Sequence, residues 1–428
     1  MPSLRPRPLG RSAGDPSFSI FLVTVVLCLF RARDLPALEL GIAGTDIAIN
    51  PADVGLLLTG GLALQRLRAS ARVPSSALLG AAGAFAGLVF LSSLPNGADA
   101  VVAAGKLVEL GALTLGAAAF LESRRRLQGL LIVIVGFGAV ATTWGLIGFL
   151  TSDRGRQASF VGEHDLAAVA TMGLAVGLAR LHARRGNPGA LALVGIVAGV
   201  VGVVLGASLA SLLGVYFAAA VILVVALRRG DLRWTAALLT LAVAGVASAG
   251  TLALRQGDLG FLQSWFGPPP DTPGEYASSW SQRLIFTYIG GRIFLDQPVL
   301  GIGWHGLLPP EEFARYVPDA RTRFPDQPPH YFPETDAPFI PQQTYDQVLF
   351  QLGLVGVAIF LALALVAVRR AAATARRRWA DAAYLPPALL GSLAGAIAGA
   401  ALFGGSPLTA LFWLTLGLVA ADLGGEAA

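Results

Sequence analysis

The chain has 428 residues, of which 55% are hydrophobic and 13% are charged, whereas a soluble domain carries about 25% charged residues. This composition excludes an ordinary soluble enzyme and indicates a protein whose solvent is largely lipid. The net charge of +5 does not indicate a nucleic-acid partner, because the basic residues form small clusters between apolar runs. With a lone cysteine, Cys28, and four scattered histidines, the sequence predicts no disulfide, no metal and no other cofactor.

Twelve apolar segments are long enough to cross a membrane, since a spanning helix needs about 20 largely apolar residues. They cover residues 16–31, 50–66, 75–94, 98–121, 128–150, 165–181, 189–206, 208–227, 234–253, 346–368, 383–403 and 406–423. The fold class we expect is therefore all-α and integral to the membrane, with about 12 transmembrane helices. The first segment is also short enough for a signal-peptide core, but we favour a retained span.

One uncharged run, residues 189–227, supplies both the seventh and the eighth segment. As a single helix it would be about 58 Å long, nearly twice the thickness of the apolar core of a bilayer, which is about 30 Å. We therefore expect the chain to turn back near Gly206, Ala207 and Ser208.

The arginines orient these segments, because the cytoplasmic loops of membrane proteins carry an excess of Lys and Arg. Most of the 31 Lys and Arg residues, including the clusters at 124–126 and 369–378, fall on the side of the membrane that holds the N-terminus. Both termini are therefore expected in the cytoplasm. The chain then divides into spans one to nine (1–253), an extracytoplasmic loop (254–341) and spans ten to twelve (342–428).

The long loop is the expected functional region, because a loop of this length in a compact protein is usually functional or disordered. Its segment "SWSQRLIFTYIGGRIF" predicts an amphipathic helix, in which Trp280, Leu284, Tyr288 and Ile289 recur at helical spacing.

A sharp turn is predicted after this helix at Gly301-x-Gly303, since glycine adopts backbone conformations that other residues avoid. The next residue, Trp304, is expected to anchor at the level of the lipid headgroups.

The segment "RLIFTYIGGRIFLDQPVLGIGWHGL" resembles the arginine-bearing helix, and the P-l-x-G-x-G pattern that follows it, of the O-antigen ligase and polymerase superfamily. "PQQTYDQVLFQLGLVGVAIFLALAL" resembles its H-N-x-y-L-x-x-l-x-x-x-G-l-x-G start of the tenth span, and "FVGEHDLAAVATMGLAVGLA" resembles its start of the sixth span. The large external loop between spans nine and ten is similar as well.

The resemblance implies a glycosyltransferase of the cytoplasmic (inner) membrane that works at the outer face without a metal. Its partners would be membrane lipids, an undecaprenyl-diphosphate-linked glycan and a glycan or lipid acceptor. In the family, arginines hold the diphosphate, and the histidine of the H-N motif assists the acceptor hydroxyl. Arg283 matches the arginine of the loop helix, whereas Gln342 and Gln343 stand at the H-N positions and Leu209 at that of a second arginine.

Because the family histidine is replaced, two other functions stay open. The chain is either a catalytic family member, a non-catalytic one, or a transporter of lipid-linked glycans or polysaccharide. Twin glutamines at 342 and 343 retain a hydrogen-bonding role toward sugar hydroxyls.

Arginine suits a diphosphate because its planar fork binds two phosphate oxygens at once. Arg283 and Arg292 lie nine residues apart and do not share a helix face, and Arg283 is the preferred ligand. Both can also be solvated charges on an interfacial helix. Arg154 and Arg156 are candidates to supply the phosphate contact that a leucine at position 209 does not make.

Lys106 is a further candidate for phosphate binding. It lies about 12 Å into the fourth span, at 1.5 Å per residue, and one turn before Glu109. Intramembrane charges usually face the interior of the bundle, so Lys106 is either a phosphate ligand or half of a structural ion pair.

A general base must be close to the attacking hydroxyl and titrate near neutral pH, which glutamine does not. His305, His330 and His164 are the candidates, with Glu311 and Glu312 as further ones. A lone exposed histidine is usually only a polar loop residue. His164 stands out because Asp165 is next to it and a carboxylate can orient and charge an imidazole.

Overall fold

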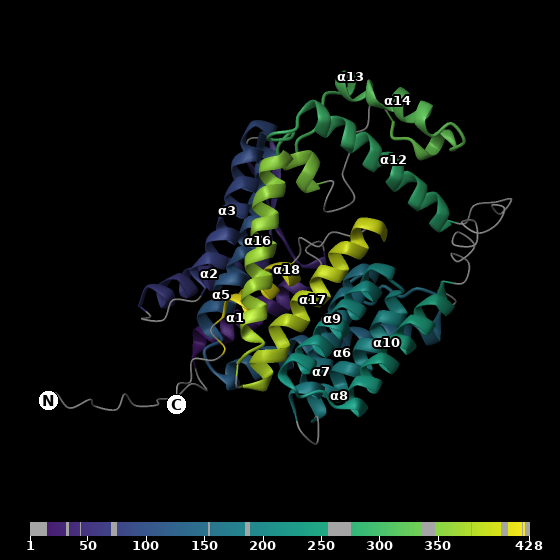
Figure 1. Ribbon diagram of the computed structural model, residues 1–428. Helices are drawn as coiled ribbons and strands as arrows, with labels where there is room; N and C mark the ends of the chain where they lie inside the picture. Colours follow the sequence, from purple (N-terminus) through teal and green to yellow (C-terminus); the bar gives the residue numbers. More distant parts are fainter. Residues whose placement is uncertain are drawn as a thin grey trace.

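In a computed structural model the chain forms a bundle of long helices with a smaller helical layer over one end (Figure 1). The structure describes residues 15–30, 34–42, 44–69, 75–152, 155–184, 189–255, 275–334, 347–377, 379–403, 410–421 and 423. We call residues 275–334 the loop layer, and the end of the bundle beneath it the loop-layer end.

Each apolar segment of the sequence lies on a helix of the bundle. These helices are α1 (Pro16–Leu29), α2 (Pro51–Ala69), α3 (Ser76–Ser93), α4 (Gly97–Glu109), α5 (Gly111–Phe120), α6 (Arg124–Thr151), α7 (Glu163–Ala183), α8 (Ala190–Gly206), α9 (Leu209–Arg229), α10 (Trp234–Leu254), α16 (Leu352–Thr374), α17 (Ala380–Phe403) and α18 (Ala410–Ala420). Within the described residues, seven helical stretches are long and apolar enough to cross a membrane, and α1, α8 and α18 are shorter apolar helices. The chain is thus a multi-pass helical membrane protein, and the count of 12 crossings stays a prediction.

The loop layer holds α12 (Glu275–Asp296), α13 (Pro310–Phe313), α14 (Tyr316–Arg323) and the 3-10 turn η5 (Pro329–Tyr331). Two further short turns flank it: the 3-10 turn η3 (Leu94–Asn96) follows α3, and the π-helical turn η6 (Gln347–Gln351) precedes α16.

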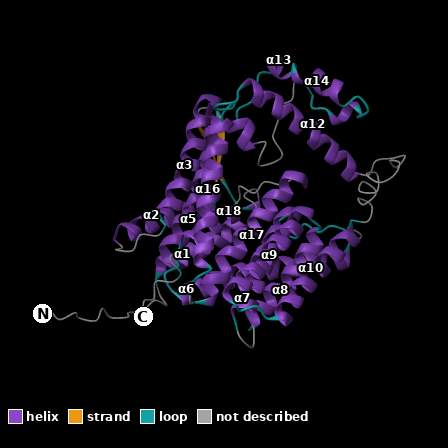
Figure 2. Ribbon diagram, viewed as in Figure 1, coloured by secondary structure: helices purple, strands orange, loops and turns teal. Residues whose placement is uncertain are grey.

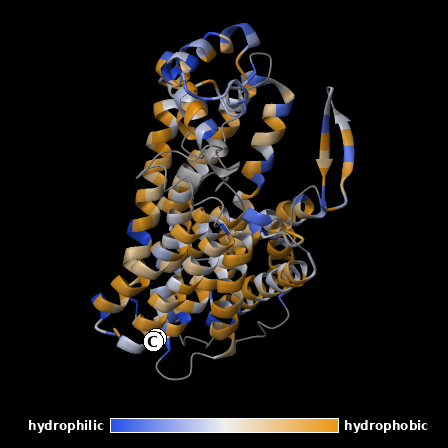
Figure 3. Ribbon diagram, turned by 90° about the vertical axis from the view of Figure 1, so that its right-hand side faces the viewer, coloured by the Kyte–Doolittle hydropathy of each residue, from blue (hydrophilic) through white to orange (hydrophobic). Residues whose placement is uncertain are grey.

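The all-α architecture expected from the sequence holds for the bundle, and the structure adds one short β-hairpin between α1 and α2. There β1 (Leu38–Ile42) and β2 (Thr45–Ile49) pair as an antiparallel hairpin, with Leu38 opposite Ile49, shown as strands in Figure 2. Apolar side chains alternate with other residues along both strands, which is the pattern of a β-strand. Figure 3 shows the hairpin projecting from the bundle toward the loop-layer end.

The expected reversal within residues 189–227 is confirmed. Helix α8 ends at Gly206, Ala207 adopts a left-handed conformation with φ of 44°, and α9 starts after Ser208. The Ser208 hydroxyl accepts a hydrogen bond from the backbone N–H of Ser211 at 3.4 Å, as a helix N-cap does.

Glycines let several bundle helices pack backbone against backbone, as small residues do between membrane helices. A Cβ atom at Gly199 of α8 would lie 2.9 Å from the carbonyl oxygen of Ala170 in α7. A Cβ atom at Gly395 of α17 would lie 2.3 Å from the carbonyl oxygen of Leu213 in α9. These close approaches join α8 to α7 and α17 to α9.

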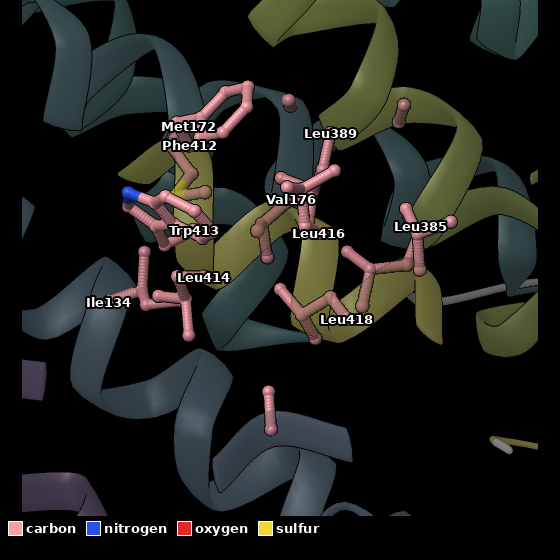
Figure 4. Close-up of a cluster of buried hydrophobic side chains, with 14 of the residues drawn as sticks. Ile134, Met172, Val176, Leu385, Leu389, Phe412, Trp413, Leu414, Leu416 and Leu418 are labelled. Atoms are coloured by element: carbon pink, nitrogen blue, oxygen red, sulfur yellow. The ribbon is translucent and has the colours of Figure 1, made fainter. Parts of the chain in front are cut away.

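The short helix α18 runs through the centre of the core and is buried along almost its whole length. Its side chains pack against α6, α7 and α17, and Figure 4 labels Ile134, Met172, Val176, Leu385, Leu389, Phe412, Trp413, Leu414, Leu416 and Leu418 from this cluster. A helix that is apolar on all sides is expected in such a position.

Ion pairs and backbone bonds mark the end of the bundle opposite the loop layer. Asp15, which caps the start of α1, pairs with Arg66 near the end of α2 and with Arg126 at the start of α6. The backbone N–H of Ser75, before α3, donates to Ala420 O at the end of α18. Helices α1, α3 and α6 therefore begin, and helices α2 and α18 end, at this end of the bundle.

Candidate functional site

The loop layer is fixed to the bundle by backbone hydrogen bonds between two of the motif segments. The N–H of Gly303 donates to Gln351 O at 2.8 Å, and the N–H of Leu354 donates to Pro298 O at 2.8 Å. Further bonds run from Ile302 and Val355. The P-l-x-G-x-G segment and the start of α16 thus form one backbone ladder.

The glycines of both segments make this ladder possible. Gly301, Gly303 and Gly353 have φ values of 65°, 86° and 61°, a region that residues with a side chain rarely adopt. A Cβ atom at Gly353 would lie 2.5 Å from the carbonyl oxygen of Val299. The sharp turn expected at Gly301-x-Gly303 is confirmed.

Trp304 does not anchor at the lipid headgroups as expected. The residue is only 3% exposed, its backbone N–H donates to the Ser92 hydroxyl at 3.3 Å, and its backbone carbonyl accepts from Asn96 Nδ2 at 3.4 Å. The same Nδ2 donates to Ile302 O at 3.1 Å. The turn is therefore pressed onto the end of α3, which buries the indole in protein.

Helix α12 is the amphipathic helix expected in the loop, but its buried face differs from the one expected. Ile285, Ile289 and Ile293 are fully buried and pack on side chains of α13 and α14, while Leu284 is 40% exposed. On another face, Arg292 Nε pairs with Asp319 Oδ2 at 3.1 Å. Arg292 is thus engaged within the loop layer itself.

A group of charged side chains lies at the start of α7. The segment before it turns at Gly162, which has a φ of 104°, and places Glu163, His164 and Asp165 in the first helical turn. Arg156 Nη2 pairs with Glu163 Oε2 at 3.0 Å and donates to Gly206 O at 3.4 Å. Arg156 therefore reaches the α8–α9 turn that precedes Leu209.

The same turn packs directly on the start of α7. A Cβ atom at Gly206 would lie 2.9 Å from the carbonyl oxygen of Glu163, and the N–H of Gln157 donates to Leu205 O at 2.9 Å. These contacts fix the first turn of α7, which carries His164, against the end of α8.

Arg283 of α12 comes to this group from the loop layer. It lies close enough to His164 to act on the imidazole electrostatically, as do Arg156, Glu163 and Asp165. The Nε atom of Arg283 is buried, whereas His164 is exposed. Residues 156, 163, 164, 165 and 283, which we call the α7 cluster, thus combine two guanidiniums, two carboxylates and an accessible imidazole.

The other two candidate histidines lie in the loop layer. His305 is exposed, has a φ of 52°, and its ring stands 5.7 Å from that of Trp304. Desolvation of the imidazole lowers the pKa of His305 below its ordinary value. His330 is exposed, and its carbonyl accepts a bond from Gln282 Nε2 at 3.5 Å. His330 therefore lies beside the turn of α12 that carries Arg283.

Lys106 contacts two carboxylates. Its Nζ pairs with Asp53 of α2 and lies 3.6 Å from Glu109 Oε1. Asp53 Oδ2 also accepts the backbone N–H of Asn50 at 2.7 Å, while Asn50 Oδ1 accepts that of Ala52 at 2.9 Å. Lys106 thus joins α4 to the capped start of α2, and the alternative of a structural ion pair gains support.

Three candidates, Arg154, Gln342 and Gln343, lie outside the described residues. Glu163 is not among the residues expected from the sequence, although its position next to His164 and after two arginines is a signal for an ion pair. In the described part of the chain, no three His, Cys, Asp or Glu side chains are arranged to hold a metal ion.

Together the apolar bundle, the anchored loop layer and the α7 cluster define a polytopic membrane protein with a mixed group of charged side chains at its loop-layer end. The O-antigen ligase family model matches residues 194–361, from α8 through α12 into α16. This range contains Arg283 and the whole backbone ladder, and it begins after His164. No curated protein matches the sequence. This match supports membership of the O-antigen ligase and polymerase superfamily, which the motif segments resemble.

Proposed function

We propose that the chain is a membrane glycosyltransferase that moves a glycan from undecaprenyl diphosphate to a hydroxyl of a glycan or lipid acceptor. The observation that carries this proposal is that Arg283, from the matched family region, and Arg156 both lie close enough to His164 to act on its imidazole electrostatically. Two guanidiniums beside an accessible imidazole supply both an anion site and a general base.

The reaction follows from this arrangement. The acceptor oxygen attacks the anomeric carbon of the donor sugar, and the bond from that carbon to the diphosphate oxygen breaks. The electron pair leaves with the diphosphate, where Arg283 and Arg156 stabilise the added negative charge. The proton of the acceptor hydroxyl passes to the imidazole of His164, and the neighbouring carboxylates stabilise the imidazolium.

Arg156 has a specific place in this proposal. The family arginine at the start of the eighth span is replaced by Leu209, and Arg156 reaches the carbonyl of Gly206 at 3.4 Å, in the turn just before that position. We therefore assign to Arg156 the phosphate contact that Leu209 cannot make. The ion pair of Arg156 with Glu163 keeps the guanidinium oriented until the diphosphate arrives.

The proposed orientation places the loop layer, and the segment 254–341 as a whole, on the outer face of the cytoplasmic membrane. In a Cys28→Ser background, Glu311→Cys in the loop layer should react with a membrane-impermeant thiol reagent in outer-membrane-permeabilised cells. Arg68→Cys, at the opposite end of the bundle, is the control and should react only after lysis. The reverse pattern would invert the orientation.

Deletion of the gene tests the activity. If the chain is a transferase, lipid-linked oligosaccharide should accumulate on the outer leaflet, or the surface polymer should shorten, and the wild-type gene should restore the polymer while His164→Ala does not. If it is a transporter, the accumulated glycan stays on the inner leaflet, where an added lectin cannot reach it. An unchanged glycan profile would support the non-catalytic alternative, which Gln342 at the histidine position favours.

A further inference from the structure

A large groove lies between α9, α16 and α17 at the end of the bundle opposite the loop layer. Its volume is about 1260 Å³, which exceeds the roughly 300–1,000 Å³ of a usual small-molecule pocket. The walls are apolar and include Phe217, Val221 and Val224 of α9 and Leu390 and Ala394 of α17. A groove of this size and polarity, open to the lipid, suits hydrocarbon chains.

The mouth of the groove is basic. The arginines that line it are Arg228, Arg229, Arg369, Arg376 and Arg377. Arg229 is committed to the fold, because its Nε pairs with Asp231 Oδ2 at 2.9 Å and its Nη1 donates to Arg377 O at 2.7 Å. It thereby fastens the end of α9 to the segment after α16 and fixes the shape of the rim.

Three rim arginines, Arg228, Arg369 and Arg376, are exposed, and no carboxylate of the described residues pairs with them. Three guanidiniums around one opening repel one another unless an anion lies between them. The complement of this site is a molecule with an anionic head at the membrane surface and apolar chains below it.

We propose that this groove binds an anionic phospholipid of the facing leaflet, with its phosphate among Arg228, Arg369 and Arg376 and its acyl chains along α9 and α17. Basic pockets between helices are suited to such headgroups, and each nearby Lys or Arg adds to the attraction. A zwitterionic lipid would bring its own cation to the rim and gain little. The site lies at the opposite end from the α7 cluster and is independent of the proposed transfer reaction.

The purified full-length protein in neutral detergent provides the test, with phosphatidylglycerol as the probe and native mass spectrometry as the measurement. The triple variant Arg228→Gln/Arg369→Gln/Arg376→Gln should bind phosphatidylglycerol on the order of tenfold or more weakly. The matched control is Arg68→Gln/Arg125→Gln/Arg184→Gln, which removes three exposed arginines outside the groove and should bind as the wild type does.

A second variant tests the apolar wall without changing the charge. Val224 is 47% exposed on α9 and lines the groove, so Val224→Trp should fold and fill the space for an acyl chain. Phosphatidylglycerol binding should fall, while the weak binding of inorganic phosphate should not change. The proposal is overturned if phosphatidylcholine binds as tightly as phosphatidylglycerol, if both arginine triples lose binding equally, or if Val224→Trp binds as the wild type does.

Discussion

Two charged groups lie near the loop-layer end of the apolar bundle, and they differ in the balance of their charges. Lys106 lies between two carboxylates, Asp53 and Glu109, so that group carries an excess of negative charge and repels a diphosphate when both are ionised. The α7 cluster holds two guanidiniums with two carboxylates and an accessible imidazole.

The two groups also differ in how they are assembled. Lys106 joins the neighbouring bundle helices α2 and α4. Arg283, in contrast, belongs to the loop layer, which the backbone ladder fixes to the bundle. A cation in the membrane is therefore not by itself a sign of a substrate site. The number of carboxylates around the cation, and the element on which the cation lies, indicate whether it has a structural or a substrate-binding role, since unpaired charges in the membrane are costly.

His164→Ala should produce the largest effect. If His164 is the general base, the transfer rate of purified protein in vesicles should fall about 10²–10⁴-fold, because the imidazole that accepts the proton is removed. His305→Ala is the matched control, since His305 lies on the turn held by Ser92 and Asn96, and it should keep most of its activity. A fully active His164→Ala together with an inactive His330→Ala would move the base to η5.

Arg283→Ala should cost about 10²-fold in transfer, at the level expected for removal of one oriented donor. Arg283→Lys should restore only part of the rate, because lysine lacks the bidentate fork. Arg292→Ala should change the rate little, because it breaks a largely exposed ion pair in which the Arg292 side chain is 51% exposed and that of Asp319 is 42% exposed. Equal losses in the Arg283 and Arg292 variants would show that both arginines act only by holding the loop layer.

Gly353→Ala should weaken the attachment of the loop layer to the bundle. Arg283 would then be held less firmly at the α7 cluster. A side chain there combines a φ of 61° with an approach of 2.5 Å to Val299 O, and strain of this kind costs on the order of 1–3 kcal/mol. Limited proteolysis within 297–334 should become faster and transfer slower. Gly83→Ala on α3, where a Cβ atom meets nothing within 4 Å, is the control and should leave both unchanged.

The bundle helices are predictable from the sequence because the hydropathy and length of a segment indicate whether it lies in the membrane. The reversal at Gly206-Ala207-Ser208 follows from the length of one run. The hairpin at 38–49 is not predicted by hydropathy averaged over the length of a span, because its strands are only five residues long. The alternation of Leu38, Leu40, Ile47 and Ile49 with other residues is nevertheless a sufficient signal for strands.

The site is only partly accessible to sequence reasoning. Arg156, His164 and Arg283 are each recognisable as candidates, but their meeting depends on an approach of α12 to α7 across more than 100 residues of sequence, and hydropathy does not say which helices are neighbours. Likewise, Trp304 is expected at the lipid surface because the sequence does not reveal that its turn is pressed onto Ser92 and Asn96. The sequence predicts where along a membrane span a residue lies, but it does not predict which distant residues that side chain contacts in the fold.

Lys106→Ala tests the structural side of the comparison. The substitution leaves Asp53 and Glu109 without their shared cation, and we expect a loss of stability of about 1–2 kcal/mol, reduced by the partial exposure of Lys106. The transfer rate per folded molecule should stay near that of the wild type. Thermal unfolding and transfer measured on the same preparation separate the two. A stable Lys106→Ala with an abolished transfer rate would return Lys106 to the substrate site.

Asp15→Asn should give the smallest effect, and one that depends on pH. Asp15 is the reverse of Lys106, a single carboxylate between two cations, 2.6 Å from Arg126 Nη2 and 3.0 Å from Arg66 Nη1. Burial alone would raise the pKa of Asp15, but Arg126, the N–H of Ser17 and Arg66 together lower it below its ordinary value of 3.8.

Because folding lowers this pKa, the stabilisation is fully present above pH 4 and is lost as the pH falls through the value in the folded protein. Asparagine still caps α1, so Asp15→Asn removes the charge alone, and the apparent Tm at pH 7 should fall by on the order of a few degrees. The difference from the wild type should shrink as the pH is lowered below 4, where the wild-type carboxylate also becomes neutral. A difference that stays constant from pH 7 to pH 3 would show that geometry, not charge, links α1 to α2 and α6 at this end of the bundle.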